Sequence, residues 1–93
     1  MILQILIIEF KQETNFRKKN KIHRRQIMSC VIKDTSQRMF LELRDDTINR
    51  IRELKLEAAD FANVEIEFNG SEKGKNYFNN IVVKAVDYAW ITD

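Results

Sequence analysis

Hydrophobic residues in this chain fall into short alternating runs, a pattern that predicts mostly β-strands. Ile2 to Phe10 is rich in β-branched side chains and has apolar residues at both parities, which predicts a first strand buried on much of both sides. We expect a long second strand from Ile22 to Lys33 and a third from Arg38 to Arg44, joined as a hairpin through the turn-forming segment DTSQ. The third strand should direct Met39, Leu41 and Leu43 inward and Arg38, Phe40, Glu42 and Arg44 outward.

One helix is expected after the third strand. Asp45, Asp46 and Thr47 offer an N-cap and acidic residues for its first turn, and apolar residues at about helical spacing follow through Leu56. The pattern predicts a helix of about ten residues, which Lys55 to Ala62 either prolongs or follows as a turn.

Two more strands are expected after the helix. Val64, Ile66 and Phe68 alternate with polar residues and predict a fourth strand, and Tyr77 to Trp90 predicts a long fifth strand. Between these strands, Asn69 to Asn76 holds both glycines of the chain and predicts an exposed loop.

The resulting order is β-β-β-α-β-β, which is the layout of the OB-fold, a five-stranded partly open Greek-key barrel with one helix. An SH3-like barrel would have no full helix at that place. OB-folds bind oligonucleotides on the face of strands two and three, flanked by the loops after strands one and four. Here those two loops are Lys11 to Lys21, a polar segment without periodicity that predicts a loop or a flexible hairpin tip, and Asn69 to Asn76.

Length and composition favour a single domain over residues 1–93, with room for one modest core. No apolar run approaches the roughly 18 residues of a membrane-spanning helix. The opening MILQILII lacks the basic start and the cleavage site of a signal peptide. The single cysteine, Cys30, excludes an internal disulfide and fits a reducing compartment, so we expect a cytoplasmic protein.

The net charge of +2 hides a strong asymmetry. Lys11 to Arg25 holds seven basic residues and one acid, a net charge of +6, while the other residues hold nine basic and thirteen acidic ones, a net charge of −4. The stretch FRKKNKIHRR from Phe16 to Arg25 therefore predicts contact with the phosphates of a nucleic acid. A solvated loop, or one that pairs with an acidic neighbouring subunit, is the alternative. The candidate phosphate-binding residues are Arg17, Lys18, Lys19, Lys21, Arg24 and Arg25.

Exposed aromatic residues are the second requirement of a single-strand binder, because bases stack on them. The candidates are Phe16 in the first loop, the outward Phe40 on strand three and Tyr77 beside the second loop. For Phe40, packing against a second subunit or under a loop is the alternative. Lys73 and Lys75 make the second loop basic. Arg24 and Arg25 are consecutive in a strand, so only one of them can face the binding surface directly.

Four sequence features resemble those of a family of small, largely uncharacterised bacterial and phage OB-fold proteins grouped with single-stranded-DNA-binding proteins. These features are RRQIMSCVIKD, FLELRDD, VEIEFNGSEKGKNYFNNIVVKAVDYAW and the closing Trp90. The resemblance extends from Ile2 to Trp90. It implies an OB-fold and suggests binding of single strands, and it lends no catalytic residues.

Catalytic or metal chemistry finds little support in the sequence. His23 and Cys30 lie seven residues apart on one expected strand, and an odd separation places them on opposite faces, so a shared metal or a nucleophilic pair is not expected. No spacing of acids resembles an acid/base pair. We therefore expect no enzyme, no cofactor, no bound metal and no small-molecule substrate.

The leading hypothesis is a non-enzymatic protein that binds single-stranded DNA, or RNA, without strong sequence preference. One small subunit covers few nucleotides, so we expect a homo-oligomer, either a dimer or a larger assembly. The alternative is a protein-interaction module, which docks on a replication or phage partner with an acidic surface or pairs an edge strand between subunits. Binding of double-stranded or structured RNA is a third hypothesis.

Overall fold

Six strands and one helix follow one another in the computed structural model, which describes residues 1–68 and 81–89. The second predicted loop and both ends of the predicted fifth strand lie outside the described residues, and so do Lys73, Lys75 and Tyr77. The elements are β1 (Ile2–Phe10), β2 (Thr14–Lys18), β3 (Lys21–Ile32), β4 (Arg38–Arg44), α1 (Asp45–Leu54), β5 (Phe61–Phe68) and β6 (Ile81–Tyr88).

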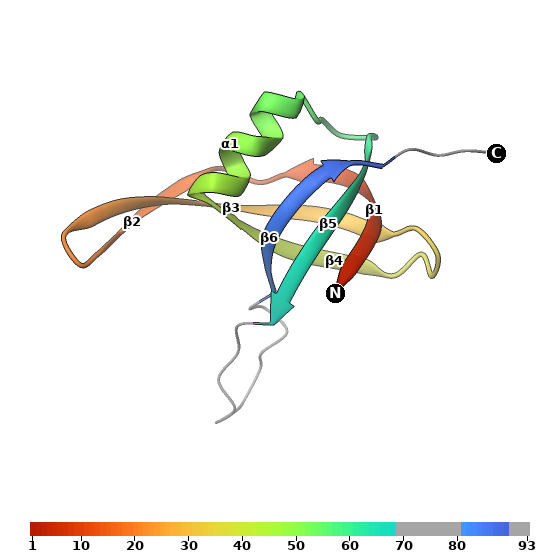
Figure 1. Cartoon of the computed structure of the whole chain (residues 1–93), viewed down its shortest axis with the longest axis horizontal. Helices are drawn as coiled ribbons and strands as arrows, with labels where there is room; N and C mark the ends of the chain where they lie inside the picture. Colours follow the sequence, from red (N-terminus) through yellow and green to blue (C-terminus); the bar gives the residue numbers. More distant parts are fainter. Residues whose placement is uncertain (69–80, 90–93) are drawn as a thin grey trace.

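Five of the strands close into a barrel. The strand order in the sheet is β1-β5-β6-β4-β3-β2, and β1 also pairs with β3, which joins the two sides of the barrel (Figure 1). The β4–β6 pairing, at Glu42 and Val82, is parallel, and the other strand pairs are antiparallel. This closed Greek-key arrangement with one helix between β4 and β5 is the OB-fold architecture predicted from the order of elements.

β2 is the element that the sequence pattern missed. It pairs with β3 from Thr14 opposite Arg25 to Lys18 opposite Lys21, so the basic stretch lies largely on a hydrogen-bonded hairpin, and six strands replace the predicted five. Lys19 and Asn20 form the tip with φ angles of 53° and 62°. Two-residue hairpin turns need positive φ at both central residues and usually contain glycine. Lys-Asn lacks that signal, so the sequence leaves both a loop and a hairpin tip open, and the structure shows the hairpin.

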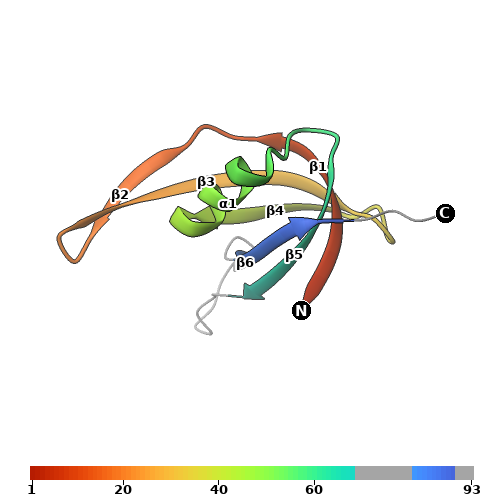
Figure 2. The same cartoon turned by 45° about the horizontal axis from the view of Figure 1, so that its top comes forward.

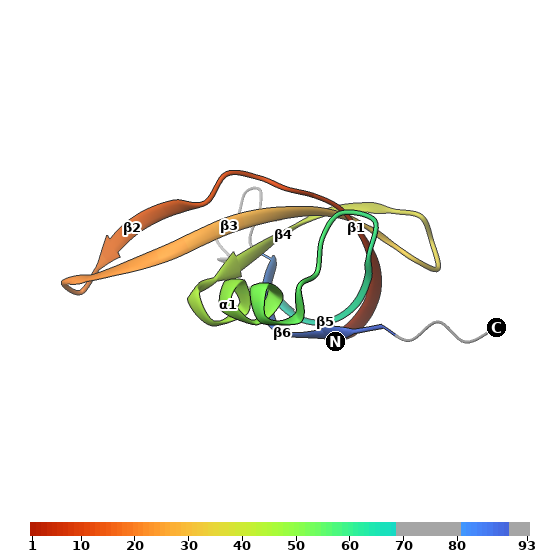
Figure 3. The same ribbon diagram turned by 90° about the horizontal axis from the view of Figure 1, so that it is seen from above.

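The hairpin of residues 14–25, called here the basic arm, extends away from the barrel. In all three views the arm lies at the end of the molecule opposite the β3–β4 turn (Figures 1, 2 and 3). β3 belongs to both parts, because residues 28–32 pair with β1 in the barrel and residues 21–25 pair with β2 in the arm. One continuous strand therefore connects the basic arm to the barrel.

The barrel interior is filled by alternate residues of the strands and by one stripe of α1. Ile48, Ile51 and Leu54, spaced three residues apart on the helix, are buried against the barrel. With ten residues α1 has the predicted length, and no helix in the described ranges is both long and apolar enough to cross a membrane. The strand residues of the core are Ile5, Ile7, Met28, Cys30, Leu41, Leu43, Ala62, Val64, Ile66, Ile81, Val83 and Val86.

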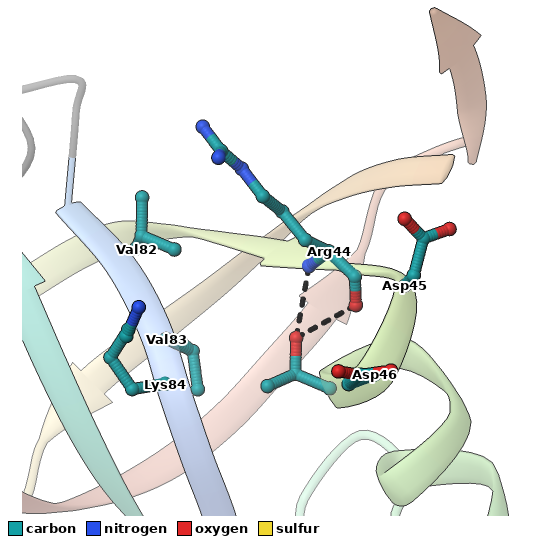
Figure 4. Close-up of a pocket in the computed structure, with 7 residues that line it drawn as sticks. Arg44, Asp45, Asp46, Val82, Val83 and Lys84 are labelled. Carbon is teal, nitrogen blue, oxygen red and sulfur yellow. Dashed lines mark hydrogen bonds between the residues drawn. The ribbon is translucent and has the colours of Figure 1, made fainter. Parts of the chain in front are cut away.

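The start of α1 differs from the expected cap. The N-cap residue is Arg44, and the Thr47 hydroxyl accepts a hydrogen bond from the Arg44 backbone N–H and donates one to the Arg44 carbonyl, both at 2.9 Å (Figure 4). The prediction that the N-cap lies among Asp45, Asp46 and Thr47 is therefore wrong by one residue. Asp45 does not cap the helix, because its carboxylate contacts His23 and the Arg24 backbone on β3.

Asp45 connects the helix to the base of the basic arm. Its Oδ1 accepts the Arg24 backbone N–H at 2.9 Å, and its Oδ2 lies 3.1 Å from His23 Nδ1. The Arg24 guanidinium also reaches Asn49 Oδ1, at 2.6 Å, one turn along the helix. The pKa of the Asp45 carboxyl is lowered, mainly by the hydrogen bond from the Arg24 backbone and to a smaller extent by the hydrogen bond with His23.

After α1 the chain turns back to the barrel without prolonging the helix. Lys55 adopts a left-handed conformation with φ of 57°, and its N–H bonds the Arg52 carbonyl, which ends the helix. β5 then begins at Phe61, earlier than the alternation from Val64 suggested. The ambiguous segment from Lys55 is therefore a turn followed by the first residues of a strand.

Cys30 provides a test of barrel closure. Its side chain is fully buried, and burial raises the pKa of the thiol to about 11. We expect the native protein at about pH 8 to react with a thiol reagent such as DTNB on the order of 100-fold more slowly than the urea-unfolded chain, because little thiolate is present and access is blocked. Equal rates in the two states would contradict the closed barrel.

The lowered pKa of Asp45 predicts a pH-dependent contribution to stability. A carboxyl with a depressed folded-state pKa stabilises the fold above its unfolded value, near 3.8, and loses that contribution as the pH falls through the folded-state pKa. In urea unfolding, the stability advantage of the wild type over Asp45→Asn should therefore be full at neutral pH and shrink as the pH falls below about 5.

The neighbouring substitution Asp46→Asn is the matched control, because it removes the same charge from the same helical turn. The stability of the Asp46→Asn variant should depend on pH in the same way as the stability of the wild type. An Asp45→Asn difference that stays constant down to the lowest pH reached would show that the contacts to His23 and Arg24 do not depend on the charge.

Candidate nucleic-acid interface

The outer surface of β3 and β4 is defined by the strand pleat. Because Met28, Cys30, Leu41 and Leu43 point into the core, the residues between them point away from it. The register places Arg25 opposite Arg44 and Ser29 opposite Phe40 on this surface. The β3–β4 outer face therefore consists of Arg25, Ile27, Ser29 and Val31 on β3 and of Arg38, Phe40, Glu42 and Arg44 on β4.

Phe40 is the exposed aromatic residue of this face. Half of its surface is accessible, whereas its cross-strand neighbour Ser29 is almost completely buried. Arg38 Nε donates to Ser29 Oγ at 3.4 Å, so the polar groups beside Phe40 are partly satisfied within the face. The ring is available to an external partner, such as a stacked base.

Glu42 lies on the same face and is buried, with 5% of its side chain exposed. It faces outward from the barrel, as predicted, and it is nevertheless covered by its neighbours. Arg44 Nε donates to Glu42 Oε2 at 2.5 Å, and Arg25 Nε lies 3.1 Å from Glu42 Oε1. Arg25 and Arg44 are directly opposite, a repulsive arrangement of like charges that the shared carboxylate offsets.

A pocket of about 250 Å³ opens where the basic arm meets this face, and Phe16, Arg25, Glu42 and Arg44 line it. Phe16 belongs to β2 and stacks on His23 across the hairpin, with ring centroids 5.3 Å apart and an interplanar angle of 26°. Two arginines, a carboxylate and an aromatic ring from three strands therefore surround one pocket.

The tip of the arm carries the solvent-exposed cations. Arg17, Lys18, Lys19 and Lys21 are exposed, and none of them forms an ion pair with another residue in the described part of the chain. The acid in this stretch, Glu13, pairs with Arg52 of the helix and so does not neutralise the tip.

Arg24 and Arg25 have different partners, as their consecutive places in a strand require. Arg24 is directed to α1, where it contacts Asp45 and Asn49, while Arg25 lies on the outer face beside Glu42. Among the predicted phosphate-binding residues, Arg24 is therefore engaged in joining the arm to the helix. Arg25 is the member of the pair that shares a surface with Phe40.

A second pocket, of about 210 Å³, lies between the start of α1 and β6 (Figure 4). Asp45, Asp46 and Thr47 line it from the helix and Val82, Val83 and Lys84 from β6. Figure 4 shows the Arg44 side chain pointing away from Asp46. Asp45 and Asp46 balance the two cations that also line this pocket, Arg44 and Lys84, so we assign no phosphate to it.

Within residues 1–68 and 81–89, no group of three or more His, Cys, Asp or Glu side chains is placed to hold a metal ion. His23 and Cys30 are separated as the strand pleat requires: His23 contacts Phe16 and Asp45 outside the barrel, and Cys30 lies in the core.

Sequence reasoning missed Glu42, Arg44 and His23 as members of the site. A signal existed for two of them, because Glu42 and Arg44 are two residues apart in a predicted strand and must share a face. The contact of Arg25 with Glu42 needed the register of the β3–β4 hairpin, and the Phe16–His23 stack needed β2, which no pattern indicated.

Comparison with known proteins confirms the fold. No protein-family model matches the chain, and a search of curated proteins gives no significant match. Among solved structures, the second OB-fold domain of replication protein A from Methanococcus maripaludis, determined by solution NMR, is similar with a TM-score of 0.67 at 11% sequence identity. The match covers 98% of this chain and 84% of that domain. The protein therefore has an OB-fold, an all-β barrel with one helix.

Proposed function

We propose that this protein is a non-enzymatic binder of single-stranded DNA that uses the basic arm and the β3–β4 outer face. The observation that carries the proposal is the continuity of these two surfaces: Lys18 and Lys21 lie opposite each other on the side of the arm that carries Phe16 and Arg25, and this side continues into the face that presents Phe40. Arg17 extends from the other side of the arm. OB-folds bind oligonucleotides on the corresponding face, which supports the same use here.

Each part of the surface has a distinct physical role in the proposal. Arg17, Lys18, Lys19 and Lys21 contact phosphates and release condensed counterions, which gives affinity without sequence preference. Phe40 and Phe16 stack on bases, and Arg25 binds a phosphate or a base edge near them. Lys73, Lys75 and Tyr77 stay part of the predicted interface, although they lie outside the described residues.

Self-association stays a prediction, and the charge of the arm restricts how it could occur. In the described sheet β2 is an end strand, so its edge could pair with a second copy. Such pairing would bring the exposed cations of two arms together, which is repulsive. We therefore expect copies to gather along one DNA strand instead of through their β2 edges.

A protein-interaction module that docks through a different, partly apolar surface is a second candidate, whereas the acidic partner of the alternative hypothesis would contact the basic arm itself. Met1 and Ile2 are about 70% exposed, and Ile2 borders a hollow of about 350 Å³ formed by residues of β1, β5, β6 and α1. That surface shares no lining residue with the pocket of Phe16 and Glu42. Substitutions in the basic arm therefore distinguish DNA binding from docking through the β1 surface.

Fluorescence anisotropy with a labelled dT oligonucleotide across a salt series tests the proposal. Phosphate contacts by Arg17, Lys18, Lys19 and Lys21 predict a log–log salt slope of about −2.8, from about −0.7 per phosphate on a single strand. The triple variant Lys18→Glu, Lys19→Glu, Lys21→Glu should reduce the slope to about −0.7 and weaken binding roughly tenfold or more at about 50 mM salt.

The control is Lys33→Glu, Lys55→Glu, Lys84→Glu, which makes the same change in net charge at exposed positions outside the arm. It should bind far more tightly than the arm variant. Absence of binding by the wild type at about 50 mM salt, or equal losses in both variants, would overturn the proposal.

Stacking on Phe40 gives a second prediction. Phe40→Ala should weaken dT binding by about 5- to 150-fold, because stacking on an aromatic ring contributes about 1 to 3 kcal/mol per base. Ile2→Ala, which shortens an exposed apolar side chain on β1, should leave the affinity unchanged. Unfolding of both variants in urea should match the wild type closely, and an unchanged affinity for Phe40→Ala would exclude this ring as a stacking platform.

A further inference from the structure

Glu42 is an unusual residue for a surface that binds a polyanion. It places a buried carboxylate between two arginines, in a pocket that Phe16 also lines. A carboxylate repels phosphates, and burying an ion pair gives little stability compared with apolar residues of similar size. The position is therefore poorly explained by phosphate binding or by stability alone.

The geometry of the pocket fits a base better than a phosphate. The pocket is a shallow depression that opens to solvent, so a planar base can approach its lining from outside. Phe16 offers an aromatic surface at the wall and is held in place by its stack on His23. The lining therefore combines an aromatic ring for stacking with hydrogen-bond donors and acceptors.

The hydrogen-bonding capacity of the pocket is specific. Each oxygen of Glu42 accepts from or pairs with one arginine Nε, and a carboxylate has about four lone-pair sites, so acceptor capacity remains on both oxygens. Each guanidinium has five N–H donors, so Arg25 and Arg44 keep donors beyond those directed at Glu42. A matching ligand presents two adjacent donors to the carboxylate and an acceptor next to them.

We infer that the pocket of Phe16, Arg25, Glu42 and Arg44 is a subsite for a single guanine of a bound DNA strand. Guanine carries N1–H and N2–H₂ side by side, with O6 as the adjacent acceptor. Glu42 accepts both donors, and an arginine donates to O6. Thymine has only one donor between two acceptors, and cytosine and adenine each offer one amino group next to acceptors. This inference rests on the proposed function and adds one base-specific position to a surface that is otherwise sequence-independent.

The test compares labelled dT oligonucleotides that differ at one central position. Replacing one dT by dG should tighten binding to the wild type by about 5- to 150-fold, the discrimination expected for one bidentate contact, whereas dA and dC should not. Inosine lacks the N2 amino group and should lose most of the gain. 7-Deazaguanine keeps N1–H, N2–H₂ and O6 and should bind like guanine.

The variant Glu42→Gln completes the test, because an amide offers only one acceptor oxygen to the base. The readout is the ratio of the affinities for the dG and all-dT oligonucleotides measured on the same variant, which should fall below about twofold. Arg38→Gln, a charged-to-amide change elsewhere on the same face, should keep the preference for guanine.

The outcomes separate the two proposals. Normal binding of all-dT with no gain for dG, equal binding of inosine and guanine, or a preference for cytosine would overturn the guanine subsite and leave the proposed function standing. Failure to bind any of the oligonucleotides would overturn the proposed function itself. If Glu42→Gln fails to fold, the inosine and 7-deazaguanine comparisons on the wild type still decide the question.

Discussion

The structure depends on the continuity of β3, whose twelve residues belong to two different pairings. At one end Met28 to Ile32 pair with β1 and close the barrel, and at the other Lys21 to Arg25 pair with β2 and form the basic arm. β4 pairs with the middle of the strand and overlaps both ends. Because a shift of one residue in a strand exchanges its two faces, the burial of Met28 and Cys30 also determines that Arg25 faces outward.

The outer face combines charges in a way that a simple basic patch does not. Exposed cations at the tip of the arm have no acidic partner in the described chain, so they remain available to phosphates, whereas Arg25 and Arg44 are held by the buried Glu42. The tip cations suit phosphate contacts, which do not depend on the base sequence and weaken as the salt concentration rises. Arg25 and Arg44 have a fixed geometry, which is the condition for reading a base edge.

Asp45 joins the helix to the basic arm, a role that its place in the sequence does not indicate. As the first residue of α1 it places an acid in the first helical turn, as predicted, but it does not cap the helix, because its carboxylate bonds the Arg24 backbone and His23. The helix and the arm are thereby joined at the point where β3 leaves the barrel. Since His23 also stacks on Phe16, this junction positions one wall of the pocket.

The sequence by itself determined the barrel strands, the single helix and the outward direction of Phe40, because alternating burial and helical spacing are local patterns with strong periodicity. It did not reveal β2, since the Lys19-Asn20 turn has no glycine and the arm has no buried face to impose a pattern. Only the tertiary structure decided that Arg24 turns to α1 and Arg25 to Glu42, because these partners come from elements that are distant in the chain and meet only through the strand register.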